Sequence, residues 1–398
     1  MLRSLFSGIS GLRAHQQMMD VTGNNIANVN TVGYKTSQVE FQDTLSQMVS
    51  AAGAPQNGAG GTNPAQVGLG VRTASINANF SQGAAETTGK SSDLMIQGDG
   101  FFVVKNGGEE LYTRAGSFTF DANGTLTTPN GQTVQGWQGV GGVVNTSNVP
   151  GDIKLPIGVT LSPSVTTNIT MTGNFSNEAA YPGDPAGSVT GATQQMSVKV
   201  YDANGSATPM VATFTKSAIN TWDMVLPDGS STPIVFTNGK GPASVTAGVA
   251  PNIYTIDTHD LTQYSGITSA HVSNSDGSAS GVLSAYTVSN TGQIVGVFSN
   301  GLKESLGQVA LANFNNVNGL EKIGDSMFRN TVNSGLAQVG PAGSQGLGLI
   351  TAGALEMSNV DLAQEFTNLV IAQRGFQANS RVITTSDEIL QELVNLKR

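Results

Sequence analysis

The chain has 398 residues, enough for two to four domains, and only 11% of them are charged, with a formal net charge of −9. This acidic balance, with lysine and arginine thinly spread, excludes nucleic-acid binding of the usual basic kind. The sequence contains no cysteine and no apolar run of about eighteen residues, which excludes disulfides, thiolate chemistry and a membrane-spanning helix.

Apolar residues at seven-residue steps open the chain and predict a helix over residues 4–24. Such a heptad series indicates a helix that packs against other helices. The apolar seam of this helix consists of Leu5, Ile9, Leu12, Met19 and Ile26. Because glycine and polar residues interrupt the beginning of the chain, we expect no cleaved secretory signal peptide.

The polar segment that follows, residues 24–35, has the composition of a shaped turn, since asparagine side chains bond their own backbone and glycine accepts a positive φ. Its characteristic residues are Asn24, Asn25, Asn28, Asn30, Thr31, Gly33, Tyr34 and Lys35. Residues 36–52 place Phe41, Leu45 and Met48 on one face of a predicted second helix. The stretch 53–70, rich in glycine, alanine and proline, predicts an extended linker.

Strand patterns fill the middle of the chain, over residues 71–137, 150–283 and 285–330. Asn-Gly pairs such as Asn106-Gly107 and Asn204-Gly205 separate several of these runs, and this dipeptide is the strongest short hairpin signal. The chain contains eight Asn-Gly pairs. We therefore predict a mainly β protein with antiparallel β domains and α-helical termini.

A second heptad series predicts a long helix at the other end of the chain. Its seam consists of Leu355, Leu362, Leu369, Phe376, Ile383 and Leu390, together with Phe366 and Val394. Ser358 with Asp361 is the predicted N-cap pairing. The polar companion positions Gln373, Ser380 and Asp387 either fix the register of helix pairing or face water.

The predicted domain order is nested. Residues 1–70 and 354–398 form an inner domain in which the terminal helices pair as in a coiled coil. Residues 71–145 and 285–353 form a first β domain, and residues 146–284 are inserted into it as an outer β domain. A helical hairpin of this size is marginal when isolated. We therefore expect the termini to be largely unfolded in the monomer and to become ordered when neighbouring copies surround them.

Motifs for catalysis and cofactor binding are missing from the sequence. It contains no nucleophile elbow, phosphate-binding loop or zinc-protease motif. The three histidines are scattered, and the Asp-Ala-Asn-Gly segments at 121–124 and 202–205 lack the further acidic ligands of a calcium loop. We therefore expect a structural protein with no catalytic residue, cofactor or metal site.

Several stretches resemble the axial proteins of the bacterial flagellar rod and hook. Residues 5–14 and 24–35 resemble the N-terminal signature of this family, and residues 93–102 and 112–118 resemble its first β domain. Residues 368–383 resemble its C-terminal signature, which here includes Gln373, Arg374, Gln377, Ala378 and Asn379.

The resemblance implies an open helical homo-polymer with the terminal helices inside and the β domains outside. Within the family, the length and the extra block at 146–284 favour a hook subunit, a curved and flexible tube that transmits torque from rod to filament and lets exported subunits pass through its bore. The implied location is extracellular, in the flagellar hook, after type III export. The implied partners are the distal rod protein, the hook cap protein, the hook–filament junction proteins, the flagellar export apparatus and the hook-length control protein.

Two other functions remain open at this stage. A rod-type axial protein with an enlarged insertion would assemble into a straight shaft. A secreted β-rich adhesin would bind its target without any contribution from the terminal helices, so deleting residues 360–398 would leave its binding intact.

Overall fold

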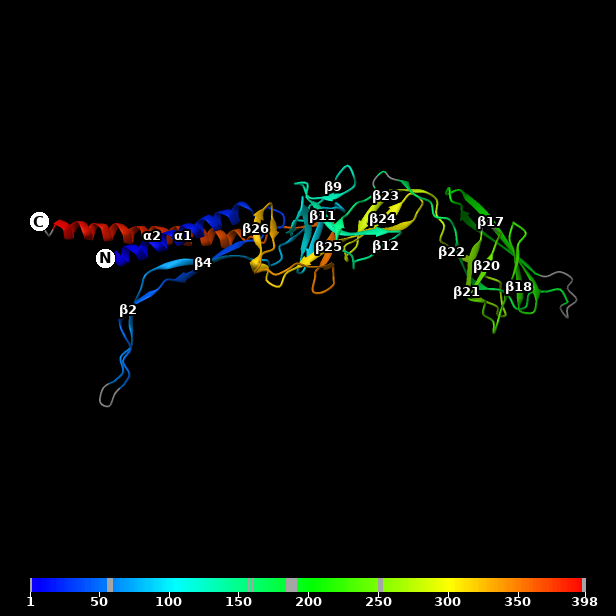
Figure 1. Ribbon diagram of the computed structural model, residues 1–398, viewed down its shortest axis with the longest axis horizontal. Coiled ribbons are helices and arrows are strands. Elements are labelled where there is room, and N and C mark those ends of the chain that lie inside the picture. Colours follow the sequence, from blue (N-terminus) through cyan, green and yellow to red (C-terminus); the bar gives the residue numbers. More distant parts are fainter. Residues whose placement is uncertain are drawn as a thin grey trace. The chain divides into compact units, whose positions relative to one another are not determined.

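The computed structural model describes residues 2–55, 60–156, 158, 160–183, 192–249 and 253–395. It contains two compact units: unit 1 comprises residues 1–155, 286–295 and 305–398, and unit 2 comprises residues 156–285 and 296–304. Strands predominate and one long helix stands near each end of the chain, so the predicted fold class is confirmed (Figure 1). No helix within the described ranges is long and apolar enough to cross a membrane.

The two helices belong to unit 1 and pack against each other. Helix α1 spans Leu2–Ala27 and helix α2 spans Leu362–Asn395. They are antiparallel, since Gly8 of α1 lies against Ile383 of α2 and Asn25, near the other end of α1, bonds Glu365. The predicted pairing of the terminal helices is therefore confirmed.

The cap of α2 differs from the predicted one. The Asp361 carboxylate accepts hydrogen bonds from the backbone N–H groups of Ala363 (2.9 Å) and Gln364 (3.2 Å), which makes Asp361 itself the N-cap. The Ser358 hydroxyl instead accepts a bond from the N–H of Val360 at 3.4 Å. The predicted cap pairing of Ser358 with Asp361 is therefore wrong, because Asp361 alone satisfies the first turn.

Leu355 does not belong to the helical seam. It lies in strand β30 (Ala354–Glu356), where it pairs with Glu86 of strand β5 (Ala85–Thr87). The heptad spacing continued back to Leu355 in the sequence, but the cap at Asp361 begins the helix six residues after it. The seam prediction is therefore wrong at this position.

The predicted second helix over residues 36–52 is also wrong. This segment forms strands β1 (Ser37–Asp43) and β2 (Ser46–Ser50), which pair with β4 (Val71–Ala78) and β3 (Ala65–Gly68) respectively. The linker predicted at 53–70 thus includes a strand. The apolar residues here have helical spacing, which led to the prediction. Pairing with a strand distant in the sequence overrides the weak helix propensity of this segment.

A large antiparallel sheet forms the β part of unit 1. Its central strands follow the order β25-β11-β7-β8-β27-β26. Their bounds are Lys303–Asn313, Thr133–Val140, Phe101–Asn106, Glu109–Thr113, Met327–Arg329 and Glu321–Gly324. The short strands β9 (Thr119–Phe120), β10 (Leu126–Thr127), β12 (Val143–Val144), β13 (Gly151–Asp152) and β28 (Gln338–Pro341) extend it. The strand order continues from β25 to β24 (Gln293–Phe298), β23 (Gly281–Val288) and β14 (Thr160–Leu161); β14 belongs to unit 2, and β23 and β24 are divided between the two units.

Two small ladders connect this sheet to the helices. Strand β6 (Leu94–Gln97) pairs with β29 (Leu349–Ala352), and β5 pairs with β30. Only five residues separate the end of strand β30 from the start of α2, so the base of α2 is held at the β part of unit 1. A 3₁₀ turn, η1, spans Val317–Gly319.

Several of the Asn-Gly pairs lie at hairpin turns, as the sequence predicts, whereas Asn57-Gly58 lies outside the described residues and Asn318-Gly319 is part of a 3₁₀ turn. Gly107, in the turn between β7 and β8, has φ +62°. Asn238 and Gly239 have φ values of +54° and +75°, and the flanking residues Thr237 and Lys240 form an antiparallel bridge. Consecutive positive φ values are the reason that Asn-Gly is favoured in two-residue hairpin turns.

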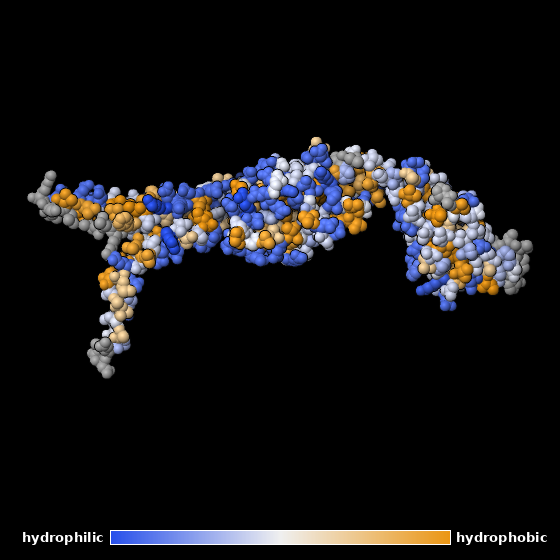
Figure 2. All heavy atoms as spheres, viewed as in Figure 1, coloured by the Kyte–Doolittle hydropathy of each residue, from blue (hydrophilic) through white to orange (hydrophobic). Residues whose placement is uncertain are grey.

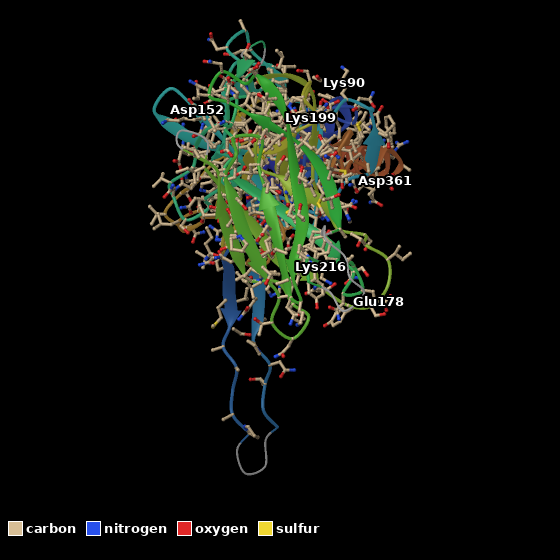
Figure 3. All side chains as sticks on the ribbon, turned by 90° about the vertical axis from the view of Figure 1, so that its right-hand side faces the viewer. Lys90, Asp152, Glu178, Lys199, Lys216 and Asp361 are labelled. Carbon is tan, nitrogen blue, oxygen red and sulfur yellow. The ribbon has the colours of Figure 1, made fainter. Side chains whose placement is uncertain are left out.

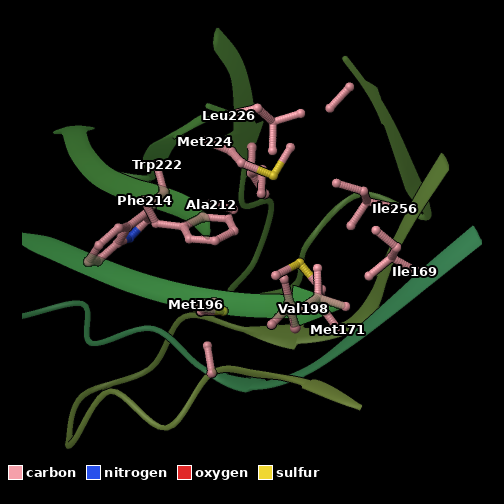
Figure 4. Close-up of a cluster of buried hydrophobic side chains, with 14 of the residues drawn as sticks. Ile169, Met171, Met196, Val198, Ala212, Phe214, Trp222, Met224, Leu226 and Ile256 are labelled. Carbon is pink, nitrogen blue, oxygen red and sulfur yellow. The ribbon is translucent and has the colours of Figure 1, made fainter. Parts of the chain in front are cut away.

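Unit 2 contains two four-stranded sheets around one hydrophobic core (Figure 4). One sheet has the order β20-β21-β15-β22, with bounds Ser244–Ala247, Tyr254–Thr262, Asn168–Asn174 and His271–Ser275. The other has the order β16-β17-β18-β19, with bounds Thr193–Tyr201, Ala207–Ala218, Thr221–Val225 and Ser231–Val235. All pairs are antiparallel except β15 with β21.

Aromatic and lysine side chains order the core of unit 2. The rings of Phe175 and Trp222 stack with centroids 4.5 Å apart. Lys216 is buried, and its Nζ donates to the carbonyl oxygens of Asn177 (2.6 Å) and Ala179 (2.8 Å), on either side of Glu178 (Figure 3). A buried ammonium requires such acceptors, so Lys216 fixes the segment that contains Glu178.

Candidate assembly site: the helical pair and its buried junction

Glycines bring α1 and α2 into close contact. A Cβ added at Gly11 would lie 2.8 Å from the Asn379 side chain, and one added at Gly375 would lie 2.5 Å from the His15 ring. Both distances are shorter than atoms tolerate without moving. A side chain at Gly11 would therefore require Asn379 to move, and one at Gly375 would require His15 to move.

Small and polar residues form the buried centre of this contact. The buried side chains are Ala14, Thr22 and Asn25 of α1 and Glu365, Ala372 and Ser386 of α2. The larger apolar residues predicted as the seam are only half-buried at its margins. They are Leu5, Ile9, Leu12, Met19 and Ile26 on α1 and Leu369, Phe376, Ile383 and Leu390 on α2.

A second apolar face of α2 is exposed to solvent in the described part of the subunit. Phe366, Val370 and Ile371 are 52%, 53% and 54% exposed, and hydrophobic residues appear at the surface of the helical pair in Figure 2. Leu362, Val382, Ile389 and Val394 are exposed as well. Exposed apolar rows of this kind mark surfaces that contact other proteins.

The polar residues of the C-terminal signature mostly face water in one subunit. Gln373, Arg374, Gln377 and Ala378 are exposed, and Arg374 donates to the Gln377 side chain at 3.2 Å. Asn379 is half-buried beside Gly11 and donates to the carbonyl oxygen of Gly375 at 2.9 Å. Among the companion positions, Asp387 is exposed and Ser380 is half-buried.

The N-terminal signature forms a buried junction at the base of the helical pair, where Gly33, Tyr34 and Lys35 are all buried. Gly33 has φ +66°, and its N–H donates to the backbone oxygen of Glu356 at 2.7 Å. A Cβ at Gly33 would lie 2.5 Å from the backbone nitrogen of Ala115. Both the backbone conformation and the space therefore require glycine at this position.

A buried ion cluster lies at the centre of the junction. Lys35 Nζ is 2.6 Å from Glu356 Oε1, and Arg114 Nη1 is 3.5 Å from Glu356 Oε2. Lys35 also donates to the backbone oxygen of Ser81 at 2.8 Å, and the N–H of Gly83 donates to Glu356 Oε1 at 2.9 Å. All three charged side chains are nearly inaccessible to solvent, so both buried cations depend on the Glu356 carboxylate for compensation of their charge.

Burial and the shared carboxylate act in opposite directions on these cations. Burial lowers the pKa of Lys35, and the hydrogen bond and charge of Glu356 oppose the shift. Burial likewise lowers the pKa of Arg114, again opposed by Glu356. The Arg114 guanidinium also lies 5.3 Å from the ring centroid of Phe101, a cation–π arrangement. One carboxylate thus serves two buried cations.

Asn25 connects three elements at the same junction. Its Nδ2 donates to the backbone oxygen of Ser37 (2.8 Å) and to the Glu365 carboxylate (3.1 Å). Its Oδ1 accepts bonds from the Tyr34 hydroxyl (3.1 Å) and the N–H of Ser37 (3.0 Å). Burial and the charge of Glu365 raise the pKa of Tyr34, which keeps its hydroxyl protonated as a donor. Asn25 therefore joins α1, β1 and α2.

The other asparagines of this signature shape the end of α1. Asn24 donates to the Tyr34 hydroxyl at 3.2 Å, and Asn28 donates to the backbone oxygen of Asn24 at 2.8 Å. Thr31 donates to Asn28 Oδ1 at 3.0 Å, whereas Asn30 is exposed. Of these bonds, the one from Asn28 to the backbone oxygen of Asn24 is a side-chain-to-backbone contact, and the others join side chains.

No pattern in the sequence identifies Arg114, Glu356 and Glu365 as partners of this signature. Arg114 lies within the stretch 112–118 that resembles the family, but nothing in the sequence indicated its charge partner. Glu356 is a single acidic residue between Leu355 and Met357, and that isolation in an apolar context was the available signal.

Alanine substitutions at two glycines of α1 separate helix contact from helix propensity. Gly23 has no atom within 4 Å of an added Cβ, so Gly23→Ala should stabilise the helical pair by about 1 kcal/mol. Gly11→Ala gives the same gain in helix propensity, but its Cβ would collide with the Asn379 side chain. The Gly11→Ala variant should therefore be less stable than Gly23→Ala by about 1–3 kcal/mol. Thermal dissociation of assembled protein measures this difference, and equal dissociation temperatures would contradict the close contact.

Family models match both ends and the middle of the chain. Residues 5–35 match the flagella basal body rod protein model, residues 95–177 match the flagellar hook protein FlgE/F/G D1 domain, and residues 351–396 match the flagellar basal body rod FlgEFG protein C-terminal model. The first and last of these regions contain the junction residues 25, 35, 356 and 365.

Curated relatives extend the similarity over the whole chain. The flagellar hook protein FlgE of Borreliella burgdorferi is 40% identical, with 100% of both chains covered. FlgE of Treponema pallidum is 37% identical, and the flagellar basal-body rod protein FlgG of Bacillus subtilis is 34% identical, each with 100% of both chains covered. A crystal structure of FlgE2 from Helicobacter pylori has a similar fold, with a TM-score of 0.54 at 14% identity, covering 68% of this chain and 100% of that one. The chain therefore belongs to the FlgE/F/G family of flagellar hook and basal-body rod proteins.

Proposed function

We propose that this protein is the subunit of the bacterial flagellar hook and polymerises into a curved, flexible tube. The observation that carries this proposal is the uncovered apolar face of α2, where Phe366, Val370 and Ile371 are each about half exposed. In an open helical polymer, a neighbouring copy would bury this face through a repeated head-to-tail contact. Several full-length relatives are named hook proteins.

The nested domains have separate roles in this proposal. The inner domain, residues 1–70 and 354–398, closes the tube and lines the bore through which exported subunits pass. The β domains, residues 71–145 with 285–353 and residues 146–284, lie outside and change partners as the tube bends. The polymer transmits torque as a universal joint, which is a structural rather than an enzymatic role.

A hairpin arm of unit 1 supplies a second surface for neighbouring copies. Strands β2 and β3 are exposed along their whole length, and Leu45 beside them is 84% exposed. Residues 44–70 carry no charged side chain. A two-stranded hairpin with exposed apolar residues is marginal on its own, so we propose that contact with another copy in the tube stabilises it.

The proposed location is the flagellar hook outside the cell, reached through the flagellar export apparatus without a cleaved signal peptide. The proposed partners are the distal rod protein at one end, the hook–filament junction proteins at the other, the hook cap protein during assembly and the hook-length control protein during export. These follow from the place of a hook subunit in the flagellum.

Electron microscopy of polymer assembled from the purified chain tests the proposal. Curved tubes are the expected result. A second candidate function, a straight distal rod, is favoured by the full-length match to the FlgG rod protein, and straight tubes would support it instead. Monomer that never assembles, or unchanged assembly after deletion of residues 360–398, would contradict both.

A further inference from the structure

The last residues of α2 extend beyond the described part of α1. Gly8 of α1 faces Ile383, and α1 begins six residues before Gly8, at Leu2. Six residues beyond Ile383 in the antiparallel helix is Ile389, so α2 from Leu390 to Asn395 extends past the described part of α1 (Figure 1).

The end of α2, from Asp387 to Asn395, is amphipathic, with two adjacent carboxylates at its start. Asp387, Leu390, Gln391 and Val394 line one face of it, with Val394 66% exposed. Asp387 and Glu388 are exposed at its start. An unpaired helix end with apolar residues and two carboxylates is suited to a groove that offers apolar contact and positive charge.

A groove of this kind lies elsewhere on unit 1, between α1 and β4. It has a volume of about 400 Å³ and includes Phe6, Ile9, Arg13, Val71 and Arg72 in its lining. Phe6 is 65% exposed, and both arginines are exposed. The helix α2 of the same subunit packs on the Gly8 and Gly11 side of α1.

We propose that this groove binds the overhanging end of α2 from a second copy of the chain. Arg13 and Arg72 would pair with Asp387 and Glu388, while Leu390 and Val394 would cover Phe6 and Val71. Because α2 is one continuous helix that leads away from the groove, its end cannot return to the groove of its own subunit. The contact joins two different surfaces, so it generates an open helical polymer wherever the rotation between copies does not close a ring. It rests on the proposed function and specifies which surfaces meet.

A charge swap tests the pairing in the full-length chain. Arg13→Glu with Arg72→Glu should slow assembly at least tenfold, measured by sedimentation of polymer, and so should Asp387→Lys with Glu388→Lys. All four substitutions in one chain should restore assembly to within about threefold of the original, since opposite charges then face each other again. Lys90→Glu with Lys105→Glu gives the same net charge as the arginine variant and should assemble normally.

Each outcome either supports or overturns the proposal. The pairing would be overturned if the variant with all four substitutions failed to assemble. It would also be overturned if the arginine double variant or the Asp387/Glu388 double variant assembled normally. If the original chain forms curved tubes in the same experiment, only this contact is refuted and the hook function stands. If the original chain forms no tubes, the proposed function fails first. Circular dichroism of each monomer identifies variants that have lost their fold, and for these Arg13→Gln with Arg72→Gln repeats the test without added negative charge.

Discussion

Replacing both Val370 and Ile371 with aspartate should abolish assembly of the chain. The unfolding transitions of unit 2 and of the β part of unit 1 should stay unchanged. Each side chain is about half exposed in the subunit, so covering the remainder contributes about 1 kcal/mol per residue. Burying an unpaired carboxylate in its place costs several kcal/mol more. The loss of more than about 3 kcal/mol per contact would raise the critical concentration by over about 100-fold.

The matched control keeps the face apolar. Val370→Leu with Ile371→Leu should assemble near the original concentration, because the buried area is retained. Critical concentrations from sedimentation compare the variants directly. Normal assembly of the aspartate variant would show that this face of α2 stays in water in the polymer, contrary to the proposed packing.

Replacing Glu356 with glutamine should destabilise the base of the helical pair by about 3–5 kcal/mol, the usual cost of removing one partner of a buried ion pair. The change leaves Lys35 and Arg114 buried without their carboxylate. The free energy of opening measured by hydrogen exchange at the Gly83 amide should fall by the same amount, because this N–H donates to Glu356 Oε1.

Two further variants delimit this effect. Glu86→Gln alters an exposed glutamate on β5, the strand paired with β30, and should change stability by less than about 0.5 kcal/mol. Adding Lys35→Met to Glu356→Gln removes one uncompensated cation and should recover part of the loss. Exchange at Gly83 that is unchanged by Glu356→Gln would contradict the role of the ion cluster.

Local patterns were enough to predict several parts of the fold. The heptads near both ends predicted α1 and most of α2, because packing against a helix imposes its own period on the sequence. Asn238-Gly239 and the other turn dipeptides predicted hairpins, because few residues accept the backbone conformation of those turns. The antiparallel β architecture followed from these turns, with β15 and β21 as the parallel exception.

Distant pairings accounted for the errors. The apolar residues of segment 36–52 have helical spacing, yet β1 pairs with β4. The local sequence does not encode this pairing. Leu355 fits the heptad spacing, but it lies in strand β30, which pairs with β5. Lys35 and Glu356 are separated by 321 positions, so no local pattern could identify them as partners.

The helix contact shows a further limit of periodicity. A heptad analysis selects large apolar residues, whereas the buried centre here contains Ala14, Ala372 and Ser386. Close helix packing around Gly11 and Gly375 leaves no room for large side chains. The larger residues then lie at the margins and on the exposed face of α2, where a neighbouring copy can cover them.

The central claim is that the distal parts of α1 and α2 acquire their order from adjacent copies, beyond the buried junction that ties their base to unit 1. Hydrogen exchange of residues 366–393, compared between dilute monomer and assembled tubes, tests this most directly. We expect fast exchange in the monomer and strong protection in the tubes. Slow exchange throughout these residues in dilute monomer would contradict it.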